Sequence, residues 1–247
     1  MDEWRYEPTA DFDQAPIERL RRFPRHPDLL VYAVRLVTNL AIRIVMRVWN
    51  RLEIEGREHL PKEGSFVLVG NHASHFDAPA LLAALPLGMI HRAFPAAASD
   101  YFFTNVSKLI FSAIVVNAMP FDRKENPRRS IELCRQVLES PGHVLILFPE
   151  GTRTLDGTIG MFKPGIGFVT AGTEFPVVPC YLEGAFRAWP KGKWLPRPRK
   201  LRLRIGPPLR FPDRTPARED AIAIAAELRE AVLGLAASTR VADSTSC

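Results

Sequence analysis

The sequence has 247 residues, 47% of them hydrophobic and 24% charged, which is an ordinary globular mixture with enough apolar side chains for a sizeable core. Its cysteines lie far apart, at Cys134, Cys180 and Cys247, which excludes a disulfide framework and a zinc site and favours a reducing compartment. The net charge of +6 favours an anionic partner, which could be a phosphate-bearing substrate, a membrane surface or a nucleic acid.

Residues 1–27 are polar and punctuated by proline, and we expect them to be mostly irregular. They carry a basic cluster at Arg19, Arg21, Arg22 and Arg25. The chain does not open on a basic stretch followed by an apolar core, so we expect no secretory signal.

The segment from Leu29 to Trp49 contains no proline or glycine, and we expect a helix that Asp28 caps. Its polar residues recur at spacings of four and form one narrow stripe: Arg35, Asn39, Arg43 and Arg47. Three arginines argue against a membrane span, which needs about 20 apolar residues with few charges. Two interpretations stay open. We favour a helix lying in a membrane interface, because its apolar face is wide; the alternative is a core-packing helix with one solvated edge.

Beyond residue 50, apolar stretches of strand length alternate with helical ones. Expected strands are 51–55, 65–69, 91–96, 115–121, 143–148 and 176–182, with 200–205 as an edge strand that has one solvated face. Expected helices are 78–85, 101–114, 130–138, 166–171 and 219–236. This alternation predicts a single α/β domain over residues 51–237, with a mixed, mostly parallel sheet flanked by helices. An N-terminal basic segment with an amphipathic helix (1–50) precedes it, and a disordered tail (238–247) follows.

The polar stretch Gly70–Asp77 lies between a predicted strand and a predicted helix, where α/β folds place their chemistry. Histidine is the side chain most easily poised as a base near neutral pH, which makes His72 a candidate general base. A carboxylate such as Asp77 could fix the tautomer of that ring. At about 100° per helical residue, two positions five apart do not share a helix face. The pair can therefore meet only if His72 lies in the turn and Asp77 begins the helix.

Other readings of the same stretch stay open. Ser74 beside two histidines suggests the nucleophile of a serine hydrolase or thioesterase, although no Gly-x-Ser-x-Gly elbow is present. His72 and His75 could bind a metal at a spacing of three, but no third ligand is suitably placed, so we expect no metal site. His75 is more simply a packing or hydrogen-bonding residue.

Basic and glycine-containing loops follow three further predicted strands or turns. In the stretch 148–154, Gly151 permits a tight turn, Arg153 could grip a phosphate, and Glu150 could accept a substrate hydroxyl or order the loop. Further cations lie in other loops, at Arg123, Lys124 and Lys163. Each is individually compatible with a solvated surface charge. Together they predict an anion site at the strand ends.

Four blocks of this sequence resemble those of the glycerolipid acyltransferases, the lysophosphatidate-type (1-acylglycerol-3-phosphate) family. The blocks are Asn71-His72 to Asp77, Met119 to Arg123, Phe148 to Arg153, and Val178-Pro179-Cys180. Their order and spacing also match, and the resemblance covers roughly residues 50–210.

The resemblance implies that His72 takes a proton from the acceptor hydroxyl while Asp77 orients and charges its ring. The freed oxygen would attack the thioester of an acyl-CoA or acyl-carrier protein, without a covalent acyl-enzyme, a metal or another cofactor. Residues implied to bind substrate phosphate are Arg123, Lys124, Glu150, Gly151, Thr152, Arg153 and Lys163. The implied product is phosphatidate, formed from 1-acylglycerol 3-phosphate.

The stretch after the first block departs from the family pattern. Family members often carry a lysine-containing segment before a Glu-Leu pair, and residues 96–103 lack it here. Another lysolipid or a lipid alcohol therefore stays open as acceptor, as does a non-catalytic lipid-binding module.

A lipid acceptor implies membrane access, and we expect a peripheral or monotopic protein on the cytoplasmic side, in contact with anionic lipids. The loop 189–200 interleaves basic and aromatic residues, as a membrane-surface loop or a solvated hairpin would. It carries no nucleic-acid recognition motif, and we expect no nucleic-acid partner.

Overall fold

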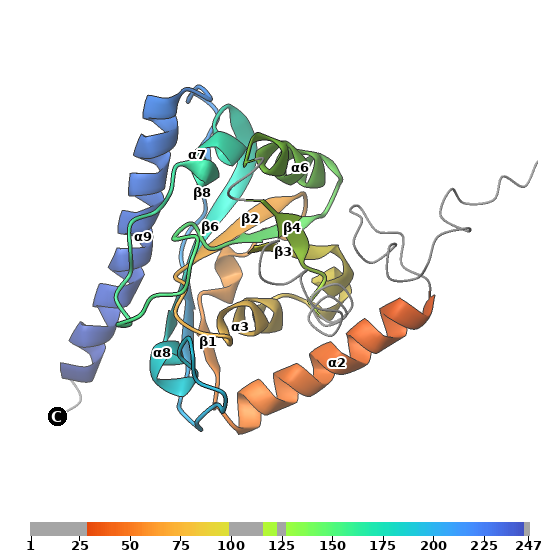
Figure 1. The fold of residues 1–247 in the computed structure, drawn as a ribbon, viewed down its shortest axis with the longest axis vertical. Helices are drawn as coiled ribbons and strands as arrows, with labels where there is room; N and C mark the ends of the chain where they lie inside the picture. The colour runs from red at the N-terminus through yellow and green to blue at the C-terminus, as the bar shows by residue number, and fades with distance from the viewer. Residues whose placement is uncertain (1–28, 99–115, 123–126, 245–247) are drawn as a thin grey trace, which may run out of the picture.

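A mixed sheet of eight strands forms the centre of the computed structural model, which describes residues 29–98, 116–122 and 127–244 (Figure 1). The strands are β1 (Glu53–Glu55), β2 (Phe66–Gly70), β3 (Ala93–Ala98), β4 (Met119–Phe121), β5 (Val144–Leu147), β6 (Thr173–Glu183), β7 (Arg202–Ile205) and β8 (Leu209–Phe211). The helices are α2 (Leu29–Val48), α3 (Asp77–Ala84), α6 (Pro127–Glu139), α7 (Gly165–Thr170), α8 (Ala185–Ala188) and α9 (Arg218–Ser244), with 3-10 turns η1 (Arg57–His59) and η2 (Leu87–Arg92).

The strand order is β1-β7-β6-β2-β5-β3-β4, and β8 pairs with β6 off this path. β6, β2, β5, β3 and β4 are mutually parallel, whereas β7 and β8 run antiparallel to β6. The predicted α/β fold with a mixed, mostly parallel sheet is therefore confirmed. Because β2, β5 and β6 run parallel, their carboxyl ends meet at one edge of the sheet.

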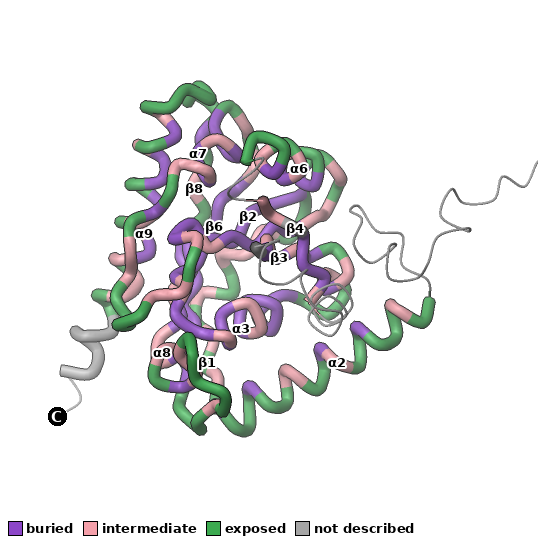
Figure 2. The backbone as a smooth tube through the Cα atoms, in the orientation of Figure 1, coloured by how far each residue is buried: buried purple, intermediate pink, exposed green. Residues whose placement is uncertain are grey.

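Side chains alternate between two cores across the central strands, as the pleat of a strand requires. In β2, Phe66 and Leu68 pack in the core that contains α3, whereas Val67 and Val69 pack in the core beneath α6, α7 and α9. Both faces of β2 are buried, which explains why its sequence is a continuous apolar run without alternation (Figure 2).

Helix α2 packs Arg35, Asn39 and Arg43 of its polar stripe against the protein, so the solvated polar edge considered for it is wrong for these three residues; only Arg47 of the stripe is exposed. Arg35 and Asn39 are buried, and the guanidinium of Arg43 donates to the carbonyl oxygens of Leu82, Ala83 and Leu85 at 2.7–3.1 Å. These carbonyls lie at the carboxyl end of α3, where a helix lacks intrahelical donors and a cation is favourable. Arg43 of this stripe therefore caps α3.

The predicted edge strand at 200–205 is also wrong, because β7 is paired on both sides, with β1 and with β6. Its leucines are buried, and its arginines form ion pairs: Arg204 pairs with Glu55 at 3.0 Å, and Arg202, which stays partly exposed, pairs with Glu53 at 3.3 Å. Leucines and basic residues alternate because one face of β7 is buried and the other face forms ion pairs.

Three features of the fold differ from the elements predicted from the sequence. The sequence predicted neither β8 nor α8, and α9 continues to Ser244, within the tail predicted to be disordered from residue 238. The predicted helix at 101–114 lies outside the described residues.

Candidate active site

His72 and Asp77 meet where β2 ends and α3 begins. β2 ends at Gly70, His72 lies in the following turn, and Asp77 is the first residue of α3. Nδ1 of His72 lies 2.8 Å from Oδ2 of Asp77. This is the turn-to-helix arrangement that the five-residue spacing required.

The carboxylate of Asp77 also holds the turn itself. Its Oδ2 accepts the backbone N–H groups of Ala73 at 2.7 Å and Ser74 at 2.8 Å, and the side chain is only 1% exposed. An ionised carboxylate can only accept, so Nδ1 of His72 carries the proton and Nε2 keeps its lone pair. The ring is therefore oriented with its basic nitrogen away from Asp77.

The His72 ring is fixed on its face as well. It stacks on Phe148 with ring centroids 4.4 Å apart and planes at 16°. Its side chain remains 25% exposed, so a substrate can reach it. Phe148 directly follows β5, the neighbour of β2, which is how a residue 76 positions later comes to lie against the histidine.

Asn71 ties the start of the turn to the next strand. Its Oδ1 accepts the N–H of Leu182 at 2.8 Å, and its Nδ2 donates to the carbonyl of the same residue at 3.2 Å. Asn71 was noticed only as part of the family block. Its bridge to β6 spans 111 positions, and no local pattern could have indicated it.

Glu150 orders the loops around the histidine. Its Oε1 accepts the N–H of His72 at 2.7 Å, and its Oε2 accepts the N–H of Gly160 at 3.0 Å. Burial raises the pKa of this carboxyl, although the two N–H groups oppose the shift. Of the two roles considered for Glu150, the geometry favours loop ordering.

Gly151 lies in the left-handed region with φ +72°, and a Cβ there would come within 2.9 Å of Nζ of Lys163. The lysine side chain thus covers the glycine. Next to it, Thr152 is exposed, and its Oγ1 accepts from Lys191 at 3.4 Å. The backbone N–H of Thr154 donates to the carbonyl of His72 at 2.8 Å, which joins this loop to the turn.

Arg153 reaches back to the same turn, where its Nη1 hydrogen-bonds to Nε2 of His75. Burial, and then the positive charge of Arg153, lower the pKa of His75 to about 4. His75 is therefore neutral near pH 7 and accepts from the guanidinium. Sequence reasoning treated His75 as a packing or hydrogen-bonding residue and missed its partner.

Ser74 is not available as a nucleophile. Its Oγ donates to the carbonyl of Trp189 at 2.9 Å and accepts the N–H of Phe76 at 3.1 Å, and the residue is 1% exposed. The hydroxyl joins the turn to the segment after α8, which contradicts the serine-hydrolase reading.

Arg123 and Lys124 lie outside the described residues. The strand before them, β4, runs parallel to β3 and ends at the same sheet edge as β2. In the part of the chain that the structure describes, no group of three His, Cys, Asp or Glu side chains is placed to hold a metal ion.

Comparison with known proteins identifies relatives of this chain. A family model described as acyltransferase matches residues 51–183. A 1-acyl-sn-glycerol-3-phosphate acyltransferase of Limnanthes alba is 29% identical over 167 residues, which are 66% of this chain and 56% of the relative. Tafazzin of Drosophila melanogaster is 28% identical over 213 residues, 77% of this chain and 56% of the relative. The chain thus spans little more than half the length of these two relatives.

Among solved structures, the crystal structure of the 1-acyl-sn-glycerophosphate acyltransferase PlsC from Thermotoga maritima is similar. The TM-score is 0.62 at 25% sequence identity, and the match covers 82% of this chain and 80% of the other.

Proposed function

The chain belongs to the acyltransferase family, and from this premise we propose that it transfers a fatty acyl group from an acyl thioester to the hydroxyl of 1-acylglycerol 3-phosphate. The observation that carries the proposal is the His72–Asp77 pair, whose geometry leaves Nε2 of His72 as an accessible base. The relatives named 1-acyl-sn-glycerol-3-phosphate acyltransferases support this acceptor.

In the proposed reaction, Nε2 of His72 takes the proton of the acceptor hydroxyl as its oxygen attacks the thioester carbonyl. Asp77 stabilises the imidazolium that forms, as a buried carboxylate does for a histidine base. The tetrahedral intermediate then collapses, the carbon–sulfur bond breaks, and the thiolate leaves and takes up the proton. The products are phosphatidate and the free thiol.

We propose that the cations near the turn that holds His72 bind the acceptor phosphate. Arg153 is held beside His72 through His75, and Lys163 lies over Gly151 in the same loop system. Arg123 and Lys124 would add two charges from the end of β4. A guanidinium can bind a phosphate through two parallel hydrogen bonds, which orients it as well as attracting it.

Two observations favour a second candidate acceptor, another lysophospholipid or a lipid alcohol. Tafazzin, a relative with a different name, aligns over a larger share of this chain than the Limnanthes enzyme does. Residues 96–103 also lack the lysine-containing segment common in the family. Another lysophospholipid or a lipid alcohol would fit the same chemistry, because His72 acts on the hydroxyl and not on the head group.

We propose that α2 places the enzyme on a membrane. Its length and composition alone would allow it to cross a membrane. Because Arg35, Asn39 and Arg43 face the protein, the outward surface is mostly apolar, and Arg47 is the exposed charge of this helix. The exposed apolar side chains in and directly after α2 include Leu29, Leu30, Val37, Ile44, Val45, Val48 and Trp49. Trp194 and Leu195, in the basic loop after α8, are also exposed. A large exposed apolar surface next to basic residues suits the cytoplasmic face of an anionic bilayer.

The function is tested with the purified full chain, labelled oleoyl-CoA and a panel of acceptors: lysophosphatidate, lysophosphatidylcholine, lysophosphatidylglycerol and monoacylglycerol. We expect acylation of lysophosphatidate, and at least a 1,000-fold lower kcat in His72→Ala, near the upper range for a general base (about 10²–10⁴-fold). Unchanged turnover in the variant would contradict the base assignment.

Turnover of another lysolipid without lysophosphatidate would contradict the acceptor. Vesicle binding with no transfer to any acceptor would favour a lipid-binding module over an enzyme.

A further inference from the structure

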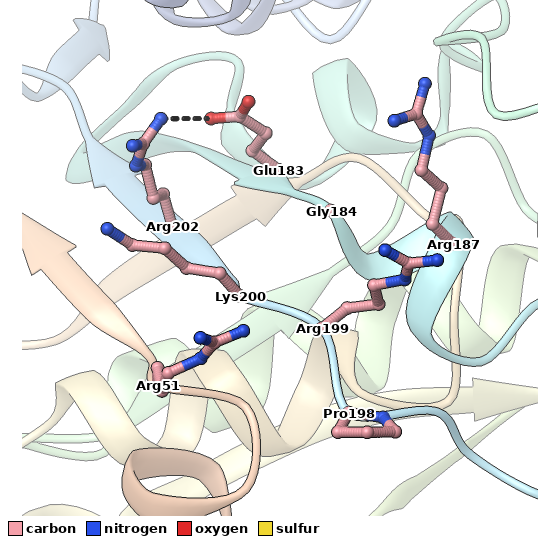
Figure 3. Close-up of a pocket in the computed structure, with 8 residues that line it drawn as sticks. All are labelled: Arg51, Glu183, Gly184, Arg187, Pro198, Arg199, Lys200 and Arg202. Carbon is pink, nitrogen blue, oxygen red and sulfur yellow. Dashed lines mark ion pairs between the residues drawn. The ribbon is translucent and has the colours of Figure 1, made fainter.

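A basic pocket of about 350 Å³ lies at the sheet edge beyond β6, away from the His72 turn. Figure 3 shows the cationic side chains that line it, from the segment after α2, from α8, and from the start of β7 and the residues just before it. The charged residues that line it are Arg51, Arg187, Arg199, Lys200, Arg202 and Glu183. Five cations face a single carboxylate within the pocket.

Only some of these cations are neutralised by the protein. Lys200 bonds to Glu53 at 2.6 Å, and Arg202 pairs with Glu53 at 3.3 Å and with Glu183 at 3.8 Å. Arg51, Arg187 and Arg199 have no ion pair with any residue that the structure describes. Like charges gathered in one pocket repel one another unless an anion lies between them.

The backbone at Arg51 is held in an uncommon conformation. Its φ is +48°, in the left-handed region that residues other than glycine rarely adopt. Buried Asn50 fixes this geometry, because its carbonyl accepts the N–H of Leu201 at 3.0 Å and its Nδ2 donates to the carbonyl of Arg199 at 3.3 Å. Such strain persists where the surrounding structure enforces it and is frequent at ligand sites. Here it holds Arg51 beside Arg199.

The pocket and His72 lie at the same end of the strands, where β2 and β6 both finish. Glu183 follows Leu182, the residue to which Asn71 is bonded, and β6 is the direct neighbour of β2. Arg51 precedes β1, which lies three strands from β2 in the order β1-β7-β6-β2. Three interstrand spacings correspond to about 14 Å.

This separation decides which substrate the pocket suits. In 1-acylglycerol 3-phosphate the phosphate is only a few bonds from the hydroxyl that reacts, so it must bind close to His72. In acyl-CoA the diphosphate and the 3′-phosphate lie at the far end of the long pantetheine arm. Only the donor places phosphates this far from the thioester.

We propose that this pocket binds the phosphates of the donor nucleotide, which makes acyl-CoA the donor. The inference rests on the proposed acyl transfer, since it places the thioester at His72. A carrier protein would dock through several hundred Å² of surface, whereas a concave site of about 350 Å³ is of the size that holds a small ligand.

The test compares wild type with R51Q/R199Q, both of whose arginines lack a described ion-pair partner. The control R210Q/R218Q removes the same number of charges at β8 and the start of α9; β8 pairs with the opposite end of β6. Each protein is assayed in neutral vesicles with palmitoyl-CoA, with a palmitoyl-carrier protein and with palmitoyl-pantetheine, which has no phosphates. The donor is varied at saturating acceptor, and the acceptor at saturating donor.

We expect R51Q/R199Q to raise the KM for palmitoyl-CoA at least tenfold, in line with the loss of charged hydrogen bonds. The KM for the acceptor and the rate with palmitoyl-pantetheine should stay within twofold of wild type, and the control should be unchanged. An equal loss with palmitoyl-pantetheine, or a loss only with a carrier-protein donor, would overturn the proposal.

Calorimetric titration with CoA separates this proposal from the reaction itself. Wild type should bind CoA, and R51Q/R199Q should bind it at least tenfold more weakly; absence of CoA binding by wild type would overturn the site. CoA binding that depends on these arginines, without acyl transfer to any acceptor, would refute the function and leave the site standing. If the variant loses only binding to phosphatidylglycerol vesicles and keeps CoA affinity, the pocket binds a lipid headgroup and the proposal is wrong.

Discussion

Nδ1 of His72 lies 2.8 Å from Oδ2 of Asp77, and the same oxygen accepts two backbone N–H groups of the intervening turn. One buried carboxylate therefore shapes the turn and orients the ring. The base and the residue that positions it form a single local unit between β2 and α3, so a change at Asp77 affects the chemistry without involving distant parts of the fold.

Asp77→Asn should lower kcat by about 1,000-fold, because the neutral amide cannot stabilise an imidazolium and permits the wrong tautomer. The amide oxygen can still accept from the turn, so the KM for the acceptor should change less than threefold. Steady-state kinetics on both substrates measure the effect, with circular dichroism as the check on folding. A kcat within tenfold of wild type would contradict the proposed role.

Ser74→Ala should retain activity within about threefold, since the hydroxyl bonds to Trp189 and Phe76 and faces no substrate. Loss of these bonds should lower the free energy of unfolding by about 1–2 kcal/mol. Urea denaturation and the acyl-transfer assay measure the two effects. Labelling of Ser74 in wild type by a fluorophosphonate probe would contradict this assignment.

His75 should make stability depend on pH. Its pKa is about 4 in the folded protein and about 6.5 when unfolded, so the unfolded chain binds more protons between these values. The contribution of neutral His75 is fully present above pH 6.5 and is lost as the pH falls toward 4. We expect a loss of roughly 2 kcal/mol, reduced by partial solvation of the ring.

Urea unfolding of wild type and His75→Gln at pH 7, 6, 5 and 4 isolates this effect, because the other histidines are common to both proteins. The difference in unfolding free energy between them should shrink or change sign as the pH falls. A difference that stays constant over this range would show that His75 does not titrate as described.

The outward face of α2 should carry membrane binding. Val37→Asp/Ile44→Asp places two charges at positions that are 64% and 63% exposed. The double variant should bind vesicles containing phosphatidylglycerol at least tenfold more weakly than wild type. Ile222→Asp changes an exposed apolar side chain on α9 and should bind like wild type. Vesicle sedimentation measures both, and equal retention of the two variants would argue against docking through α2.

Arg43→Met should destabilise the protein by about 2–4 kcal/mol, because the carbonyls of Leu82 and Leu85 at the end of α3 lose their charged donor, whereas that of Ala83 keeps Arg57. Arg47 lies one turn later on α2 and is exposed, so Arg47→Met is the matched control and should change stability by less than about 0.5 kcal/mol. Thermal and urea denaturation compare the two. Equal stability of both variants would show that the cap of α3 contributes little.

Local patterns identified most of the central elements. β2 and β5 are continuous apolar runs, and the helix after Gly70 begins at Asp77 because the turn and the carboxylate are encoded within eight residues. Family blocks then indicated which loops gather at the sheet edge. The elements missed or misplaced, β8 and the position of β7 inside the sheet, depend on pairing between strands distant in sequence.

The sequence by itself determined the α/β class, the turn that holds His72 and Asp77, and the presence of an apolar N-terminal helix, because each follows from residues close together in the chain. Only the tertiary structure decided that Arg43 of α2 faces the end of α3, that His75 meets Arg153, and that Asn50 bonds to Arg199. The orientation of an amphipathic helix and the partner of a charge depend on which surfaces lie next to each other. Contacts across 40 to 150 positions leave no periodic signal in the sequence.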